Sequence, residues 1–300
     1  MSWTVALRRL YIKSHFNEEP SGKFYCPSSG NTIFVLYLTD RQIFTFAADE
    51  KYWNSIFMKR NPIKQFLISF IPRHMCNSVV LKVYCLLALI PVPKRIRRKN
   101  HAHNAISLKN AKWDFLSVPS AYIENQNEWG EILYGWGPHH NMKYSGCEII
   151  ATFNALKALG KACSPDIMAE LISEYEKRGA ALWGEFGVSP PAICAYLKRQ
   201  GFLPLSSKRA DDKSWNMADS QCQVFIATVY NDAKDITAQI HTVCITKEEN
   251  RYILHNTYRR NQKGDYVASI SYATLKEAIV HISGQEVKML YLIGISSNTD

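Results

Sequence analysis

Four short apolar runs in the last third of this chain of 300 residues constrain its fold more than any other feature. They are rich in β-branched and aromatic residues, which is typical of β-strands. The runs are QVFIATVY, HTVCITKE, RYILHNTY and KMLYLIGI. Only Glu249 and Asn250 separate the second run from the third, so we predict a hairpin there and antiparallel strands. A short helix is predicted over SYATLKEAI, between the last two runs.

Upstream of these strands the hydrophobic spacing is that of helices. Three helix starts are marked by serine, at Ser145, Ser164 and Ser189. After the last two, proline occupies the first helical position and glycine follows the last one. Helices first and antiparallel strands afterwards are typical of an α+β domain. We therefore predict an α+β fold for residues 116–300.

The positive charge of the chain is concentrated in its N-terminal part. The net charge is +10, and residues 1–115 hold 18 Lys and Arg against 6 Asp and Glu. Within this part, NTIFVLYLTDRQIFTF predicts two short strands on either side of Asp40 and Arg41. The stretch KRIRRKNHAHNAISLKNAKWD is polar and basic and has little amphipathic period. We therefore predict a basic N-terminal region of unknown fold over 1–100 and a linker over 101–115.

The apolar run over residues 79–93 has two interpretations. It is shorter than the roughly 20 residues that a helix needs to cross a bilayer. It can be a buried helix of a small N-terminal domain with a solvated basic end. Alternatively, residues 79–99 form an interfacial helix whose lysines and arginines contact an anionic membrane. No nucleic-acid-binding motif accompanies the basic cluster, so we expect no nucleic acid partner.

The cysteines and the N-terminus favour a cytoplasmic protein, peripheral at the inner membrane surface if the interfacial interpretation holds. The eight cysteines are irregularly spaced and form no CxxC pair, which favours a reducing compartment. The N-terminal apolar run is too short and too charged for a secretory signal. His101 and His103 lack acidic or cysteine neighbours that would complete a metal site. We expect no metal and no organic cofactor.

Cys147 differs from the other cysteines because it lies where a helix is predicted to begin. Residues 145–148 fit the capping box S-x-x-E, in which Ser145 and Glu148 satisfy each other's backbone N–H groups. The unpaired N–H groups at such a helix start favour a thiolate. The charge of Glu148 opposes the thiolate, so a basic partner is expected. Asn141, six residues earlier, can direct an amide N–H at an oxyanion beside the sulfur.

A histidine and an asparagine are predicted to lie together on the hairpin. If Glu248 pairs with Arg251, then His241 and Asn256 are diagonal neighbours on one face. The amide of Asn256 then lies within reach of the imidazole. Together with Cys147, these residues supply a nucleophile, its proton partner and a group that fixes the imidazole tautomer.

The order of these segments resembles the papain-like cysteine peptidases. Among them it is similar to the bacterial peptidase-like domains related to those that remove double-glycine leaders from bacteriocin precursors. The resemblance covers residues 135–295 and is carried by NMKYSGCEIIATFNALKALGK, SPDIMAELISEY, GVSPPAICAYLKRQGF, QVFIATVY and IHTVCITKEENRYILHNTY. It implies a papain-like fold with Cys147 as nucleophile and His241 as general base and acid. It also implies that Asn256 orients the histidine and that Asn141 is the oxyanion-hole side chain.

The chain departs from this family at three places. Glu148 and Ile149 follow the cysteine where Gly-Pro or Gly-Ala is common. Asn141 stands where such enzymes usually carry glutamine, and Asn256 stands where this branch more often has aspartate. The resemblance implies a thiol hydrolase, a peptidase that cleaves an amide bond through a thioester. The alternatives are a catalytically silent papain-like domain that binds a peptide or leader, and an acyltransferase that uses the same residues.

Overall fold

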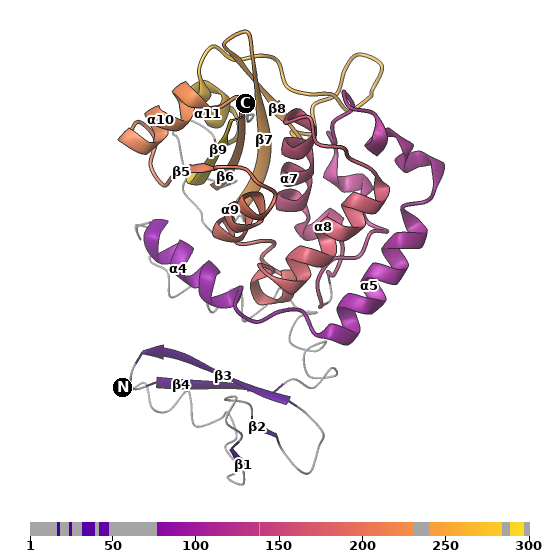
Figure 1. Ribbon diagram of the computed structural model, residues 1–300, viewed down its shortest axis with the longest axis vertical. Helices are drawn as coiled ribbons and strands as arrows, with labels where there is room; N and C mark the ends of the chain where they lie inside the picture. Colours follow the sequence, from indigo (N-terminus) through magenta and orange to yellow (C-terminus); the bar gives the residue numbers. More distant parts are fainter. Residues whose placement is uncertain are drawn as a thin grey trace. The chain divides into compact units, whose positions relative to one another are not determined.

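The chain divides into two compact units, residues 1–63 and residues 64–300, each with its own sheet. The structure is a computed structural model (Figure 1). It describes residues 17–18, 24–25, 32–39, 42–47, 77–137, 139–230, 240–283 and 289–296.

The first unit contains a four-stranded antiparallel sheet in the order β1-β2-β3-β4. Its strands are β1 (Asn17–Glu18), β2 (Phe24–Tyr25), β3 (Thr32–Thr39) and β4 (Gln42–Ala47). β3 and β4 pair with each other on either side of Asp40 and Arg41. The two strands predicted there are therefore confirmed.

The second unit is α+β, as predicted, and is built on a five-stranded antiparallel sheet in the order β5-β9-β6-β7-β8. Its strands are β5 (Leu205–Ser207), β6 (Val224–Tyr230), β7 (Ile240–Glu248), β8 (Arg251–His255) and β9 (Met289–Ile295). Glu248 lies opposite Arg251, which confirms the predicted hairpin register. The turn residues Glu249 and Asn250 have φ angles of 48° and 62°, which suit a two-residue hairpin turn.

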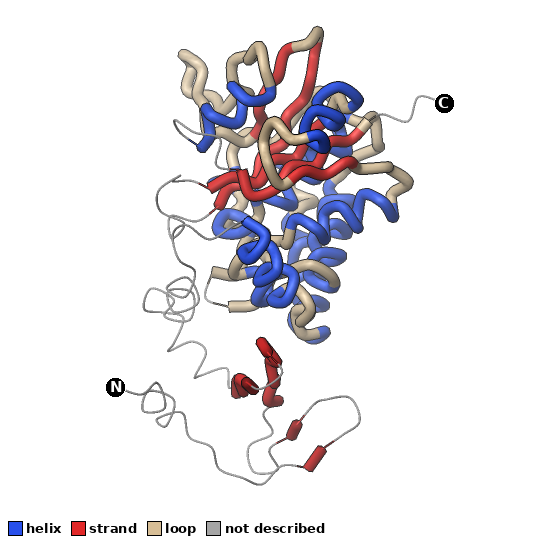
Figure 2. Tube along the Cα trace, turned by 90° about the vertical axis from the view of Figure 1, so that its left-hand side faces the viewer, coloured by secondary structure: helices blue, strands red, loops and turns tan. Residues whose placement is uncertain are grey.

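Helices cover both faces of this sheet (Figure 2). Every residue of β6 and β9 is buried. On one face lie α10 (Lys213–Gln221) and α11 (Leu275–Ser283). Their Trp215 and Leu275 share an apolar core with Phe225 of the sheet. On the other side, α7 (Cys147–Ala158) packs along β7 and β6. This packing brings the first residue of α7 close to the start of β7.

Further helices complete the second unit. They are α4 (Asn77–Leu87), α5 (Lys94–Ser107), α6 (Met142–Ser145), α8 (Pro165–Lys177) and α9 (Pro190–Arg199), with the 3-10 helices η1 (Ala111–Ser117), η2 (Gln126–Glu128) and η3 (Ala181–Gly184). The predicted starts at Ser164 and Ser189 are confirmed, because these residues precede α8 and α9. Ser164 accepts a hydrogen bond from the backbone N–H of Ile167 at 3.2 Å.

The boundary between the units lies upstream of the predicted one. The sequence predicts a linker over 101–115, whereas residues 94–107 form α5, which packs against α8. The buried side chains of α5 are Asn100 and Asn104 instead of apolar residues. A helix that buries amides has no hydrophobic period, and this is why the sequence pattern suggests a linker.

The apolar run over 79–93 forms α4 and the turn that follows it. Its Val80, Leu81, Tyr84 and Leu87 are buried, and α4 packs against η3. This favours the buried-helix interpretation, although the helix belongs to the second unit and not to a separate N-terminal domain. None of the helices in the described part of the chain combines the length and the apolar character that a bilayer crossing requires.

Candidate active site

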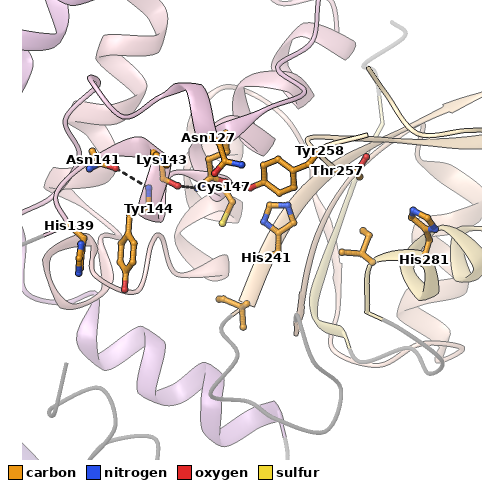
Figure 3. A pocket seen from close by; sticks show the side chains of 13 residues that line it. Asn127, His139, Asn141, Lys143, Tyr144, Cys147, His241, Thr257, Tyr258 and His281 are labelled. Carbon is orange, nitrogen blue, oxygen red and sulfur yellow. Dashed lines mark hydrogen bonds between the residues drawn. The ribbon is translucent and has the colours of Figure 1, made fainter. Parts of the chain in front are cut away.

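A pocket of about 650 Å³ lies where α6, α7, η2, β7 and α11 meet (Figure 3). Three of the four predicted site residues line it: Cys147, His241 and Asn141. The fourth, Asn256, lies behind the pocket wall and contacts His241. The fold therefore brings together side chains from three separate parts of the sequence.

Cys147 is the first residue of α7, and Gly146 fixes the junction that places it there. A Cβ atom on Gly146 would lie 2.5 Å from the carbonyl oxygen of Met142, so a larger residue would push α6 and α7 apart. The predicted capping box does not form. Ser145 ends α6, and α7 begins without a side-chain cap. The carboxylate of Glu148 is consequently free to turn elsewhere.

Glu148 turns toward the Cys147 sulfur. The thiol donates to Glu148 Oε2 at 3.3 Å, and the hydroxyl of Thr242 donates to Oε1 at 3.5 Å. Any side chain on Gly187 would clash with this carboxylate, so the glycine makes room for it. Glu148 is only 1% exposed, and burial raises its pKa to about 7 although several hydrogen bonds lower it.

The thiol of Cys147 is protonated in this arrangement. Burial, and after it the negative charge of Glu148, raise the pKa of the thiol well above its ordinary value. The backbone N–H groups of Thr242 and Glu148 lower that pKa by less. The sequence predicts a thiolate that the helix start favours and that a basic partner, His241, supports against the charge of Glu148. In the structure, desolvation and the neighbouring carboxylate outweigh the helix terminus.

His241, near the start of β7, lines the same pocket as Cys147 (Figure 3). Its Nε2 contacts the carbonyl oxygen of Asn256 at 3.0 Å. A carbonyl oxygen only accepts hydrogen bonds, so Nε2 carries the hydrogen and Nδ1 keeps a free lone pair. Burial lowers the pKa of His241, and the hydrogen bond to Asn256 raises it by less, which favours neutral imidazole. The ring of Tyr258 stacks on the imidazole at a centroid distance of 5.7 Å.

Asn256 holds His241 through its main chain, whereas the sequence predicts a contact through its side-chain amide. Its φ of 67° ends the strand geometry on which that prediction depends. The side-chain oxygen accepts instead from the backbone N–H of Gln126 at 2.9 Å. The backbone N–H of Asn256 donates to Glu124 at 2.8 Å. These bonds fix the carbonyl group that orients the imidazole.

Asn141 lines the pocket, but its amide is used in part to build α6. Its Oδ1 accepts from the backbone N–H of Tyr144 at 3.0 Å, as an N-cap. Figure 3 shows Asn141 at the far end of the pocket from His241. Asn127, which the sequence analysis missed, lines the same pocket and projects into it on the side of Cys147 (Figure 3). Asn127 is far from Cys147 in the sequence, and no motif links the two residues, so the sequence does not predict that they share a pocket.

Gln126 is a second residue that sequence reasoning missed. Its Nε2 donates to the carbonyl oxygens of Met142 and Lys143 at 3.1 and 3.0 Å. Both of its N–H groups are therefore used, and it positions α6 against η2. Its oxygen lies 3.4 Å from the hydroxyl of Tyr258, which extends the same network to the ring beside His241.

The pocket extends on both sides of Cys147. His139, Lys143 and Tyr144 border one side, and His281 of α11 borders the other (Figure 3). The described residues that line the pocket include no aspartate or glutamate. A pocket that extends on both sides of one side chain can accept an elongated ligand.

No group of three His, Cys, Asp or Glu side chains in the described part of the chain is placed to hold a metal ion. His103 instead contacts the carbonyl oxygen of Glu131 at 2.9 Å and the hydroxyl of Ser107 at 3.2 Å.

Comparisons of this chain with protein families, with curated proteins and with solved structures find no match.

Proposed function

We propose that this chain is a papain-like thiol hydrolase that cleaves an amide bond in a peptide or protein substrate. The observation that carries the proposal is the shared pocket of Cys147 and His241, with the imidazole held by the carbonyl group of Asn256. Because Nε2 donates to that carbonyl group, Nδ1 is the nitrogen available for proton transfer. This is the arrangement that a cysteine nucleophile and its base require.

In the proposed reaction, His241 Nδ1 accepts the thiol proton while Cys147 Sγ bonds to the amide carbon and the carbonyl oxygen becomes an oxyanion. The imidazolium then gives this proton to the leaving nitrogen as the C–N bond breaks, which leaves a thioester. Water adds to the thioester while His241 takes its proton. The C–S bond then breaks, the acid product leaves, and the proton returns to the sulfur.

The oxyanion needs hydrogen-bond donors close to the sulfur. The backbone N–H of Cys147, at the start of α7, is one candidate donor. The side-chain amide of Asn127 is a second, because it is exposed and projects into the pocket on the cysteine side (Figure 3). We assign this role to Asn127 in preference to Asn141, which lies at the far end of the pocket from His241 (Figure 3).

A second candidate function is a catalytically silent domain that binds a peptide. The contact between the Cys147 thiol and Glu148 favours it, because a buried thiol paired with a carboxylate is a weak nucleophile at rest.

Digestion of a proteome-derived peptide library by the full chain tests the hydrolase, with new peptide termini identified by mass spectrometry. We expect a recurring set of cleavages from the native chain and none from Cys147→Ala. His241→Ala should cleave at least roughly 100-fold more slowly, since it removes the general base. Cys163→Ala is the matched control, because Cys163 does not line the pocket and its loss should leave cleavage unchanged.

Thermal unfolding of each variant verifies that it is folded. Cleavage that persists in Cys147→Ala would overturn the hydrolase. Absence of cleavage, together with equal retention of library peptides by the native chain and Cys147→Ala, would establish the binding domain instead.

A further inference from the structure

The helix α5 has an unusual distribution of polar groups, because its buried side carries amides and its outer side carries cations. Asn100 and Asn104 face the rest of the second unit and bond to its backbone. Opposite them, at helical spacing, lies a stripe of five exposed residues. It consists of Arg95, Arg98, Lys99, Ala102 and Ile106, and is called the basic face below. α5 runs along the outside of the second unit (Figure 1), and each of these five residues is exposed.

The cations of the basic face have no acidic partners in the described part of the chain. The helix sequence KRIRRKNHAHNAIS contains no aspartate or glutamate. None of the ion pairs formed among the described residues includes Arg95, Arg98 or Lys99. Like charges on neighbouring helix turns repel one another, so the isolated helix gains nothing from this cluster. An anionic surface would relieve that repulsion.

An apolar side chain continues the same stripe. Ile106 is 75% exposed, two turns beyond Lys99, and Ala102 lies between them. A phosphodiester backbone offers nothing to an exposed isoleucine. At a membrane surface, in contrast, cations bind the headgroups and an adjacent apolar side chain enters the region between headgroups and acyl chains. The combination favours lipid over nucleic acid.

We propose that the basic face of α5 binds the anionic headgroup surface of a membrane, with Ile106 entering the headgroup region. The contact is therefore placed on α5 and not on the apolar run over 79–93, in which Val80, Leu81, Tyr84 and Leu87 are buried. Membrane binding by this face is independent of the hydrolysis proposed above.

Vesicle sedimentation with the full chain tests the proposal. Vesicles of phosphatidylcholine with about 30% phosphatidylserine imitate an anionic leaflet, and vesicles of phosphatidylcholine alone are the neutral reference. We expect binding to the anionic vesicles only, and binding that weakens as salt rises. The triple variant Arg95→Glu, Arg98→Glu, Lys99→Glu should bind at least roughly 10-fold more weakly. Ile106→Ser should weaken binding by several-fold without changing the charge.

The matched control is a triple variant with the same change of charge at scattered exposed positions, Lys177→Glu, Lys213→Glu and Lys263→Glu. It should keep most of the binding. An equal loss in both triple variants would show that net charge alone is responsible and would overturn the proposal. Unchanged binding by the α5 variant would also overturn it. So would an α5 variant that loses affinity for a duplex DNA probe but not for vesicles, because the partner would then be nucleic acid.

Discussion

After burial, Glu148 is the main influence that keeps the candidate nucleophile protonated at rest. It accepts the hydrogen of the Cys147 thiol at 3.3 Å and is almost fully shielded from water. A thiolate at Cys147 would place a second negative charge beside the Glu148 carboxylate in a buried space. Two ionisable groups this close titrate as a coupled pair. The thiol therefore stays protonated while Glu148 is ionised.

We expect Glu148→Gln to increase the reactivity of Cys147 in a way that depends on pH. Because the pKa of Glu148 is raised to about 7, the carboxylate is charged at higher pH and opposes the thiolate there. At about pH 8 the variant should be alkylated by iodoacetamide roughly 10-fold faster than the native chain, and at about pH 5.5 the two rates should converge. Peptide mapping by mass spectrometry measures both rates, with Cys163 as the internal reference.

The stability of the native chain should follow the sign of this pKa shift, whereas that of Glu148→Gln should not. The native state keeps a proton on Glu148 that the unfolded chain releases, so its free energy of unfolding falls as the pH rises from about 4.5 to about 7. The free energy of unfolding of Glu148→Gln should not fall in this pH range, because glutamine does not titrate. The control is Glu170→Gln, an exposed glutamate on α8. In the alkylation experiment, a ratio of the Glu148→Gln rate to the native rate that is the same at every pH would contradict the assigned role of Glu148.

Individual residues of the site were predictable only where a strand or helix fixes them. The hairpin register and the helix start bring His241 and Cys147 to one pocket, and both elements are visible in the sequence. Asn256 uses its carbonyl group because its φ of 67° ends the strand, and no spacing rule specifies such a residue. Glu124, which pairs with the buried His255 at 2.7 Å, comes from a loop with no recognisable pattern.

At the scale of elements, α5 holds the loop that leads to the pocket. Asn104 Nδ2 donates to the carbonyl oxygen of Leu133, and Asn104 Oδ1 accepts from the N–H of Leu133, both at 2.8 Å. Asn100 donates to Gly135 at 2.8 Å and to Glu176 at 2.6 Å. The apolar spacing in the sequence predicts the strands and most of the helices. The contact between α5 and this loop depends on polar side chains instead, so it produces no apolar spacing that could predict it.

We expect Asn104→Ala to lower the free energy of unfolding by roughly 2 to 4 kcal/mol, since it leaves the two backbone groups of Leu133 without their partner. Urea denaturation measures the change. His101→Ala, at an exposed position of the same helix, should change stability by less than about 0.5 kcal/mol. A loss for Asn104→Ala as small as that of the control would mean that the loop is held by other contacts.

At the scale of the whole molecule, α4 and α5 belong to the unit that contains the candidate site. Asn77 of α4 donates to the carbonyl oxygen of Met289 in β9 at 2.7 Å. Tyr84 meets Phe186 edge to face at a centroid distance of 6.1 Å, next to the Gly187 that makes room for Glu148. A division of the chain at 100–115 would remove these supports from the back of the site.

The second unit should therefore fold on its own only if α4 and α5 are kept with it. A fragment of residues 64–300 should unfold in a single cooperative transition. A fragment of residues 110–300 loses the four buried apolar side chains of α4 and the amide contacts of α5, and should be less stable by at least roughly 3 kcal/mol or insoluble. Urea denaturation of both fragments, followed by circular dichroism, measures the difference. Equal stability of the two fragments would place the boundary at 100–115, where the basic stretch in the sequence predicts it.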